Sequence, residues 1–337
     1  MGPAIAVDSL AKVYVVRRRA PGMRAAIRQL FAPHRELVHA LRGISFSLEQ
    51  GERVAFLGPN GAGKSTTIKL LSGILHPTSG ALSVLGMQPW AHRRRLGYDI
   101  GTIFGQRSQL WYHLPASDTF RLLARIYDMN ERAFRQRLSF LVSTFAIAHL
   151  VENPVHALSL GERMRCELVA SLLHSPKVLF LDEPTIGLDV TAKAVIRDLI
   201  RDQSARDGTT VLLTSHDTGD MERVCDRVII IDAGELVLDK TVGELRRGYI
   251  KKKIVTLVTA APALDLRLPG VTVVSASPHR VALEVDTAIT PIDELVAAAI
   301  AAARIRDLTV TDPPMEEVIR AIYRDSAELR QGRAGQP

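Results

Sequence analysis

Residues 58–66 read Gly-Pro-Asn-Gly-Ala-Gly-Lys-Ser-Thr and directly follow the apolar run Val-Ala-Phe-Leu at 54–57. The spacing fits Gly-x4-Gly-Lys-Ser/Thr, in the strand–loop–helix context that this pattern needs. Its glycines let successive backbone N–H groups face one concavity, and a helix that begins near Lys64 adds its positive end. The stretch therefore predicts a phosphate-binding loop between a buried strand and a helix.

Each residue of this loop has a predicted role. Lys64 is expected to reach the β- and γ-phosphates of a nucleotide, Ser65 to ligate Mg²⁺ through its hydroxyl, and Thr66 to contact a more inward phosphate. The remaining positions are expected to surround the phosphates with main chain: Gly58, Pro59, Asn60, Gly61, Ala62 and Gly63.

A second apolar run, at 178–181, ends in the acidic pair Asp182 and Glu183. Asp182 can hold Mg²⁺ or its water, and Glu183 can activate the water that attacks the γ-phosphate. An acidic pair alone is more often a solvated strand end. Together with the phosphate loop, it predicts a site that hydrolyses a nucleotide.

Apolar runs and segments of helical period alternate through residue 240, which predicts an α/β fold with a mostly parallel sheet and ligands at the carboxyl ends of its strands. The expected strands are 54–57, 178–181, 210–214 and 228–231, and the expected helices include 65–75 and 191–206. Residues 107–174 differ, because their patterns at 120–127 and 132–145 are helical. We expect them to form an inserted helical subdomain.

Three further motifs stand in a fixed order around the acidic pair: Leu158-Ser-Leu-Gly-Glu162, Gly187-Leu-Asp189 and Thr214-Ser-His216-Asp. With the phosphate loop, this combination closely resembles the ABC ATPase family, the nucleotide-binding subunits of ATP-binding-cassette transporters. The resemblance covers residues 4–240. It implies the P-loop fold of these ATPases, with an antiparallel β portion beside the core sheet, and it implies ATP and Mg²⁺ as ligands.

The resemblance also implies roles for single residues. Tyr14 matches the aromatic residue that stacks on adenine, and His216 the histidine that bonds the γ-phosphate. Gln106 matches the glutamine that reaches Mg²⁺ and the attacking water, with Gln109 as the alternative. Ser159, Gly161 and Glu162 match the signature that faces ATP held by the other subunit. Asp189 matches a residue that communicates across the dimer.

The signature departs from the usual Leu-Ser-Gly-Gly-Gln, since Leu160 replaces a glycine and Glu162 replaces the glutamine. Glu162 is expected to bring a negative charge near the triphosphate unless Arg163 or Arg165 offsets it. This variant is similar to a subgroup of ABC-2-type exporter and drug-resistance ATPases. Because Lys64, Asp182, Glu183 and His216 are all present, we expect hydrolysis.

Length and composition agree with two globular domains, at 337 residues with 47% hydrophobic and 23% charged. The longest apolar stretch, 295–303, is far shorter than the roughly 20 residues of a membrane-spanning helix. Residues 249–330 are expected to form a small α+β domain with a dimerisation or regulatory role. The start of the sequence does not resemble a secretory signal, and the chain has only two cysteines. Both observations favour a location in the cytoplasm.

The net charge is +7, and residues 15–42 account for +6 of it with seven arginines and one glutamate. Met23, Ile27, Leu30 and Phe31 follow the spacing of one helix face, so residues 15–40 are expected to hold a basic amphipathic insertion between two strands. A solvated insertion, a surface that docks on a membrane or a membrane protein, and a nucleic-acid contact all fit this pattern.

The resemblance therefore implies an ATP-hydrolysing motor subunit of an ABC-2-type exporter. It implies a dimer around two ATP that drives a separate permease at the cytoplasmic face of the membrane, with no nucleic-acid partner. A soluble ABC ATPase that acts on the ribosome or nucleic acid, and the ATPase subunit of an importer, are the alternatives.

Overall fold

The strand before the phosphate loop, β3 (Arg53–Leu57), lies inside a six-stranded sheet of order β5-β6-β7-β3-β8-β9. It pairs in parallel with β7 and β8. Its side chains from Val54 to Leu57 are at most 2% exposed, so both faces are buried, as the apolar run predicts. The other strands of this sheet are β5 (Ile100–Phe104), β6 (Val178–Asp182), β7 (Thr210–Ser215), β8 (Arg227–Asp232) and β9 (Glu235–Thr241).

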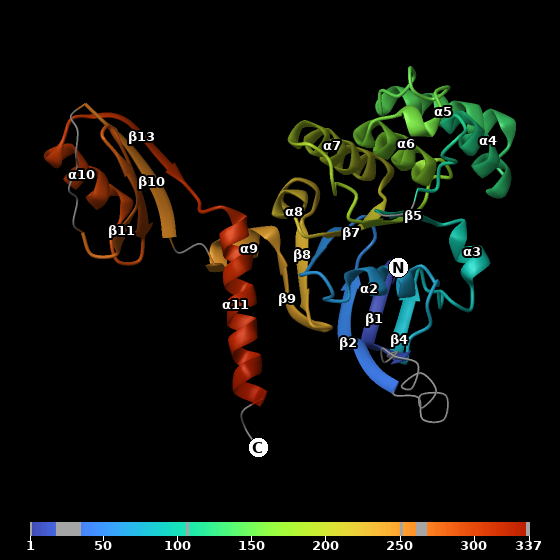
Figure 1. Ribbon diagram of the computed structural model, residues 1–337, viewed down its shortest axis with the longest axis horizontal. Helices are drawn as coiled ribbons and strands as arrows, with labels where there is room; N and C mark the ends of the chain where they lie inside the picture. Colours follow the sequence, from blue (N-terminus) through green and yellow to red (C-terminus); the bar gives the residue numbers. More distant parts are fainter. Residues whose placement is uncertain (1, 18–34, 106–107, 250–251, 261–267, 335–337) are drawn as a thin grey trace, which may run out of the picture. The chain divides into compact units, whose positions relative to one another are not determined.

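The structure is a computed structural model, and it describes residues 2–17, 35–105, 108–249, 252–260 and 268–334 (Figure 1). The chain divides into two compact units, Met1–Lys240 and Thr241–Pro337. Each unit has its own apolar core.

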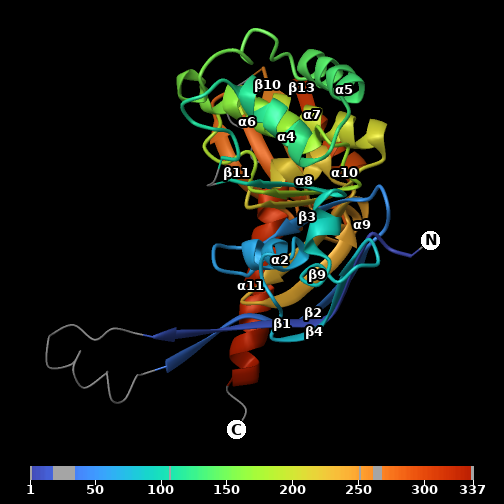
Figure 2. The ribbon, with the colours of Figure 1, turned by 90° about the vertical axis from the view of Figure 1, so that its right-hand side faces the viewer.

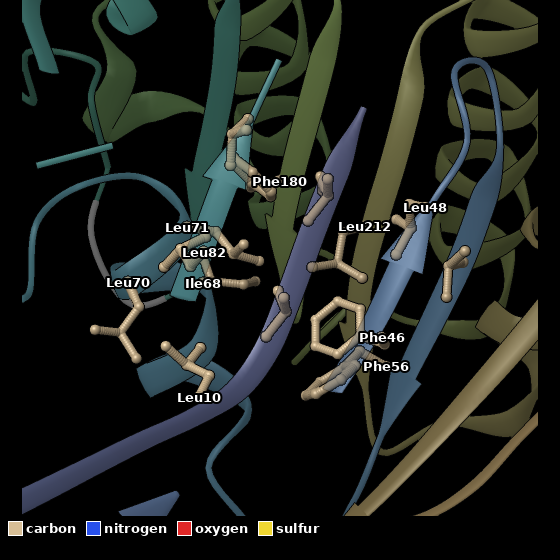
Figure 3. Close-up of a cluster of buried hydrophobic side chains, with 14 of the residues drawn as sticks. Leu10, Phe46, Leu48, Phe56, Ile68, Leu70, Leu71, Leu82, Phe180 and Leu212 are labelled. Atoms are coloured by element: carbon tan, nitrogen blue, oxygen red, sulfur yellow. The ribbon is translucent and has the colours of Figure 1, made fainter. Parts of the chain in front are cut away.

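An antiparallel sheet of order β2-β1-β4 packs beside the parallel strands. Its strands are β1 (Ile5–Arg17), β2 (Arg35–Leu48) and β4 (Ser79–Val84). The two sheets share one core with the helix α2 (Lys64–Leu71), as Figure 3 shows. In it the rings of Phe46 from β2 and Phe56 from β3 lie 5.6 Å apart.

The ends of β1 and β2 show that part of the expected basic insertion is strand. The strands stay paired as far as Arg17 and Arg35, and Figure 2 shows them as a long projecting ribbon. Residues 15–17 and 35–40 are therefore strand. The residues expected to form the amphipathic face, Met23, Ile27, Leu30 and Phe31, lie outside the described part of the chain.

Between β5 and β6 the described residues form helices, which lie together at one end of the first unit (Figure 1). Asn130 caps the second of them by accepting a hydrogen bond from the Ala133 N–H. The helices here are α4 (Ala116–Ile126), α5 (Glu131–Thr144), the 3₁₀ turn η1 (Val155–Ala157) and α6 (Leu160–Leu172). The remaining helices of the first unit are α3 (Arg93–Gly97), α7 (Val190–Asp207) and α8 (Thr218–Val224).

The second unit is a four-stranded antiparallel sheet of order β11-β12-β10-β13 with helices. Leu295 and Ala299 of α10 are fully buried in one cluster with Leu257 and Leu283 of the sheet. The elements of this unit are α9 (Val242–Tyr249), β10 (Lys252–Thr259), β11 (Val271–Ser277), β12 (Arg280–Asp286), α10 (Ile292–Ala302), β13 (Ile305–Thr311) and α11 (Met315–Ala334).

These elements confirm the predicted fold class: a mostly parallel sheet with an antiparallel portion and inserted helices, followed by a smaller α+β unit. Among the described residues, none of the helices combines the length and the apolar character that crossing a bilayer demands.

Candidate functional site

The phosphate loop runs from the end of β3 to the start of α2, and two of its glycines are fixed by close backbone contacts. A Cβ atom on Gly58 would lie 2.5 Å from the Ile231 carbonyl of β8. Gly63 caps α2 with φ at 112°, and a Cβ there would lie 2.7 Å from the Ala40 carbonyl of β2. Larger residues cannot occupy these positions without moving the strands, so the sheet itself holds the loop.

Lys64 lies buried at the first position of α2. Its Nζ donates to the Gly58 carbonyl at 2.6 Å and to the Pro59 carbonyl at 3.3 Å. It is also 3.5 Å from Oε1 of Glu183. The ammonium group is thus held inside the concavity of the loop, where a phosphate would meet it.

Asp182 and Ser65 are brought together, as predicted for a shared metal ion. Ser65 Oγ donates to Oδ1 of Asp182 at 3.1 Å. Thr214, near the end of β7 beside β6, donates to the same oxygen at 2.6 Å, and its hydroxyl also accepts from the Glu183 N–H at 3.2 Å. The motif Thr214-Ser-His216-Asp predicts no role for Thr214 itself. The parallel pairing of Asp182 with Thr214 is what brings it to the site.

Glu183 and His216 also meet. His216 Nδ1 lies 3.2 Å from Oε2 of Glu183, and the imidazole is half exposed while the carboxylate is largely buried. Glu183 has a φ of 53°, a left-handed conformation that costs energy for a residue with a side chain. This turn directs the chain away from β6 immediately after Asp182.

A cavity of about 1040 Å³ opens over these groups. Loop residues and both acids line it, and so does His216. Its size is in the range of sites for small organic ligands. The residues of the site that border it are Asn60, Gly61, Lys64, Ser65, Asp182, Glu183 and His216.

Among the described residues, Tyr14 does not border this cavity. It lies in β1 opposite Val38 of β2, and Nζ of Lys12 lies over its ring, 5.3 Å from the ring centroid. Ala40, two residues from Val38, is the residue whose carbonyl approaches Gly63. The strand pair therefore runs past the phosphate loop, and the adenine-stacking role of Tyr14 stays a prediction.

The signature residues form the start of α6. Ser159 is the N-cap, and its hydroxyl accepts from the Glu162 N–H at 3.3 Å. Glu162 Oε2 accepts in return from the Ser159 N–H at 2.9 Å and from its hydroxyl at 2.8 Å. This is a capping box. The hydrogen bonds from Ser159 hold the pKa of Glu162 below its usual value.

The charge of Glu162 was expected near a triphosphate unless Arg163 or Arg165 offset it, and Ser159 was not predicted as its local partner. The signal was present, because Ser-x-x-Glu before a helix is the pattern of a capping box. Leu160, the other departure from the usual signature, lies against the backbone of Gly187: a Cβ on that glycine would come 3.1 Å from the Leu160 Cδ2 atom.

Asp189 caps α7, where its Oδ1 accepts from the Ala192 N–H at 2.9 Å. Gln106 lies outside the described residues. Pro59 is exposed, Ala62 and Gly58 are buried, and Thr66 is half-buried. The roles that the resemblance gives to these residues stay predictions.

Comparisons with known proteins agree with this geometry. A family model described as ABC transporter matches residues 41–186. The chain is 31% identical over 207 residues to the ABC transporter ATP-binding protein NatA of Bacillus subtilis (strain 168), covering 61% of this chain and 84% of NatA. It is 35% identical over 243 residues to the daunorubicin resistance ATP-binding protein DrrA3 of Streptomyces coeruleorubidus, covering 69% and 75%.

Among solved structures, cbiO1 from Clostridium perfringens, described as part of the ABC transporter complex cbiONQ, superimposes with a TM-score of 0.60 at 27% identity. The match covers 73% of this chain and 92% of cbiO1. The chain therefore belongs to the ABC transporter ATP-binding proteins and is the ATP-hydrolysing, nucleotide-binding subunit of an ABC transporter.

Proposed function

We propose that this chain is the motor subunit of an ABC-2-type exporter, which dimerises around two Mg²⁺-ATP and drives a separate permease from the cytoplasmic face of the membrane. The observation that carries the proposal is the contact set of Glu183: its two oxygens lie 3.5 Å from Lys64 Nζ and 3.2 Å from His216 Nδ1, at the wall of the cavity. A general base, a phosphate-binding cation and a γ-phosphate ligand are thus adjacent.

The oxygen groups beside Glu183 suit Mg²⁺. This ion prefers hard oxygen ligands and usually takes only one or two from the protein, with phosphates and waters completing its shell. Ser65 Oγ and the Asp182 carboxylate, 3.1 Å apart, supply such a pair and would hold the ion. When bound, Mg²⁺ would neutralise charge on the β- and γ-phosphates.

The position of the signature supports a dimer. Ser159 is exposed at the N-terminus of α6 and is not among the residues that line the cavity around Lys64. Helix N-termini bind anions well, so this end of α6 is suited to a γ-phosphate held by a second copy of the chain. In this arrangement each ATP has ligands from two subunits.

The relatives support export. DrrA3 is named for daunorubicin resistance, and the Leu-Ser-Leu-Gly-Glu signature is similar to that of drug-resistance ATPases. For the permease, an exposed apolar segment follows Gln106 in the sequence: Trp111, Tyr112 and Leu114 are 48%, 54% and 40% exposed. We infer that this segment contacts the permease.

The test is the ATPase activity of the purified chain with and without its partners. The wild-type chain with Mg²⁺ should hydrolyse ATP. Glu183→Gln should abolish turnover and yield an ATP-dependent dimer in size-exclusion chromatography. Reconstitution with a permease encoded beside this gene should change the rate. Wild-type turnover in Glu183→Gln, or strong stimulation by RNA or DNA with no response to the permease, would overturn the proposal.

A further inference from the structure

Asp220 is a fully buried carboxylate in α8, outside the cavity, and three side chains donate to it. Oδ2 accepts from the Ser215 hydroxyl at 2.5 Å and from the Thr185 hydroxyl at 2.7 Å. Oδ1 accepts from Nε of Arg197 at 2.6 Å. A buried charge of this kind is retained only where its hydrogen bonds are satisfied.

The two hydroxyl donors flank the reacting side chains. Ser215 directly precedes His216, and Thr185 comes two residues after Glu183. One carboxylate oxygen therefore joins the two loops whose side chains meet at 3.2 Å, His216 Nδ1 to Glu183 Oε2. If this oxygen were lost, both loops would be free to shift relative to each other.

The third donor ties the same point to α7. The Arg197 guanidinium lies against Gly219, where a Cβ atom would come 2.8 Å from Nη1. Its Nη2 is 2.9 Å from Oδ2 of Asp217, and Lys193, one turn earlier in α7, donates to that oxygen at 2.7 Å. The helix that begins after Asp189 is thereby fixed to the segment that follows His216.

We propose that Asp220 is a positioning residue for ATP hydrolysis, which holds the His216 and Glu183 loops in register and anchors both to α7. The inference rests on the proposed roles of Glu183 and His216. It assigns no contact between Asp220 and ATP. The expected defect is therefore in the chemical step, because misplacement of a reacting group by about 1 Å can cost roughly a hundredfold in rate.

The experiment measures kcat and KM for ATP in Asp220→Asn, Thr185→Val and Thr185→Ser. Asp220→Asn replaces an acceptor oxygen by a donor and should lower kcat at least roughly tenfold, with KM changed less than about threefold. Thr185→Val removes one donor of the same network and should lower kcat by a smaller factor. Thr185→Ser keeps the hydroxyl and should therefore keep the wild-type kcat.

Asp198→Asn is the matched control. Asp198 also joins α7 to α8, through two 2.8 Å hydrogen bonds from Arg223, but this pair is partly exposed and touches neither loop. Its loss should leave kcat unchanged. An equal loss in Asp198→Asn would mean that any break between these helices slows hydrolysis, and would overturn the positioning role.

His216→Ala separates this inference from the proposed function. If His216→Ala hydrolyses ATP at the wild-type rate, the assignment of the site itself is wrong. If His216→Ala is inactive while Asp220→Asn and Thr185→Val keep the wild-type kcat, only the positioning role is wrong. Should Asp220→Asn not fold, the difference between Thr185→Val and Thr185→Ser decides, and equal kcat values in those two would overturn the role.

Discussion

Lys64 Nζ lies 3.5 Å from Oε1 of Glu183, so the cation of the phosphate loop and the carboxylate that follows β6 are ion-paired across the site. Lys64 is 5% exposed in its side chain and Glu183 is 19% exposed. Both groups therefore have little water around them, and water screens their attraction only weakly. ATP would bring a competing anion for Lys64, which gives the pair a direct role in nucleotide binding.

Lys64→Ala should remove the stabilisation that a nucleotide gives to the folded chain. A ligand at a hundred times its Kd stabilises the native state by about 2.7 kcal/mol. We expect a non-hydrolysable ATP analogue to raise the melting temperature of the wild-type chain and to leave that of Lys64→Ala unchanged. Differential scanning fluorimetry with Mg²⁺ measures both.

Lys177→Ala is the control for charge alone. Its side chain is 68% exposed and pairs with Asp99 at 2.9 Å. The analogue should stabilise this variant as much as the wild type. If the analogue raised the melting temperature of Lys64→Ala as much as that of the wild type, the lysine would not hold the phosphates.

Glu162→Gln restores the residue usual in the family but removes the charge, so it should destabilise the chain less than Glu162→Ala does. The glutamine carbonyl can still accept from the Ser159 N–H, so the capping box persists. Glu162→Ala loses it and should lower the free energy of unfolding by about 0.5–1 kcal/mol. Urea titrations compare the two variants, and Glu131→Gln, an acid in the first turn of α5 that pairs with Arg135, is the control.

The capping box also predicts a pH dependence. Because the hydrogen bonds from Ser159 hold the pKa of Glu162 below its ordinary value, its contribution is complete above the unfolded pKa of about 4.5 and is lost as the pH falls through the folded pKa. Wild type and Glu162→Ala should therefore converge in stability as the pH falls below 4.5. A constant difference down to pH 3 would contradict the role of the carboxylate.

Cys166 and Cys225 should not react with thiol reagents in the folded chain. Both are free and buried. Burial raises the pKa of the Cys166 thiol to about 12 and that of Cys225 in the same direction. Because the thiolate is the reactive form, labelling by a disulfide reagent at pH 8 should be slower than at an exposed thiol by more than roughly a hundredfold.

Ser143→Cys supplies that exposed thiol, since residue 143 lies on the solvent side of α5. In the variant, one thiol should react at once and two more only in denaturant. Rapid labelling of the two natural cysteines would show that the packing around them opens readily.

Strands buried on both faces were predictable, because an apolar run such as 178–181 has few other places in a fold. The edge strand β13 (Ile305–Thr311) was not. Arg306, Asp307 and Thr309 interrupt its apolar pattern, and only Ile305 and Leu308 pack on the core of the second unit.

The helix expected over 65–75 ends at Leu71 because Gly73, with φ at 72°, turns the chain against Pro89.

In the candidate site, too, some residues are predictable from the sequence and others are not. Motifs predict Lys64, Ser65, Asp182, Glu183 and His216 as site residues, because their spacing along the chain is fixed by the chemistry. Thr214 and Asp220 could not be found in this way. Their roles come from parallel strand pairing and from helix packing that join segments 32 and 35 residues apart. Such contacts leave no short pattern in a sequence.

His174 should make the chain sensitive to acid. Its ring stacks on Tyr127 at 3.8 Å, and its Nε2 lies 2.9 Å from the Ile100 carbonyl, so the neutral ring donates a hydrogen bond there. Burial lowers its pKa to about 4 from 6.5. The neutral form is the stable one in the folded chain, and its contribution is fully present above pH 6.5 and is lost as the pH falls toward 4.

Between pH 6.5 and pH 4, the neutral His174 ring loses at most about 3 kcal/mol of its contribution to the free energy of unfolding. His174→Phe keeps the stacking but has no charge to bury, so its urea midpoint should fall less between pH 7 and 4.5 than that of the wild type. At pH 7 it should be less stable, because the Ile100 carbonyl loses its donor. His92→Gln, at an exposed histidine in the same unit, should follow the wild-type curve. If His174→Phe follows it too, the acid sensitivity arises from other groups.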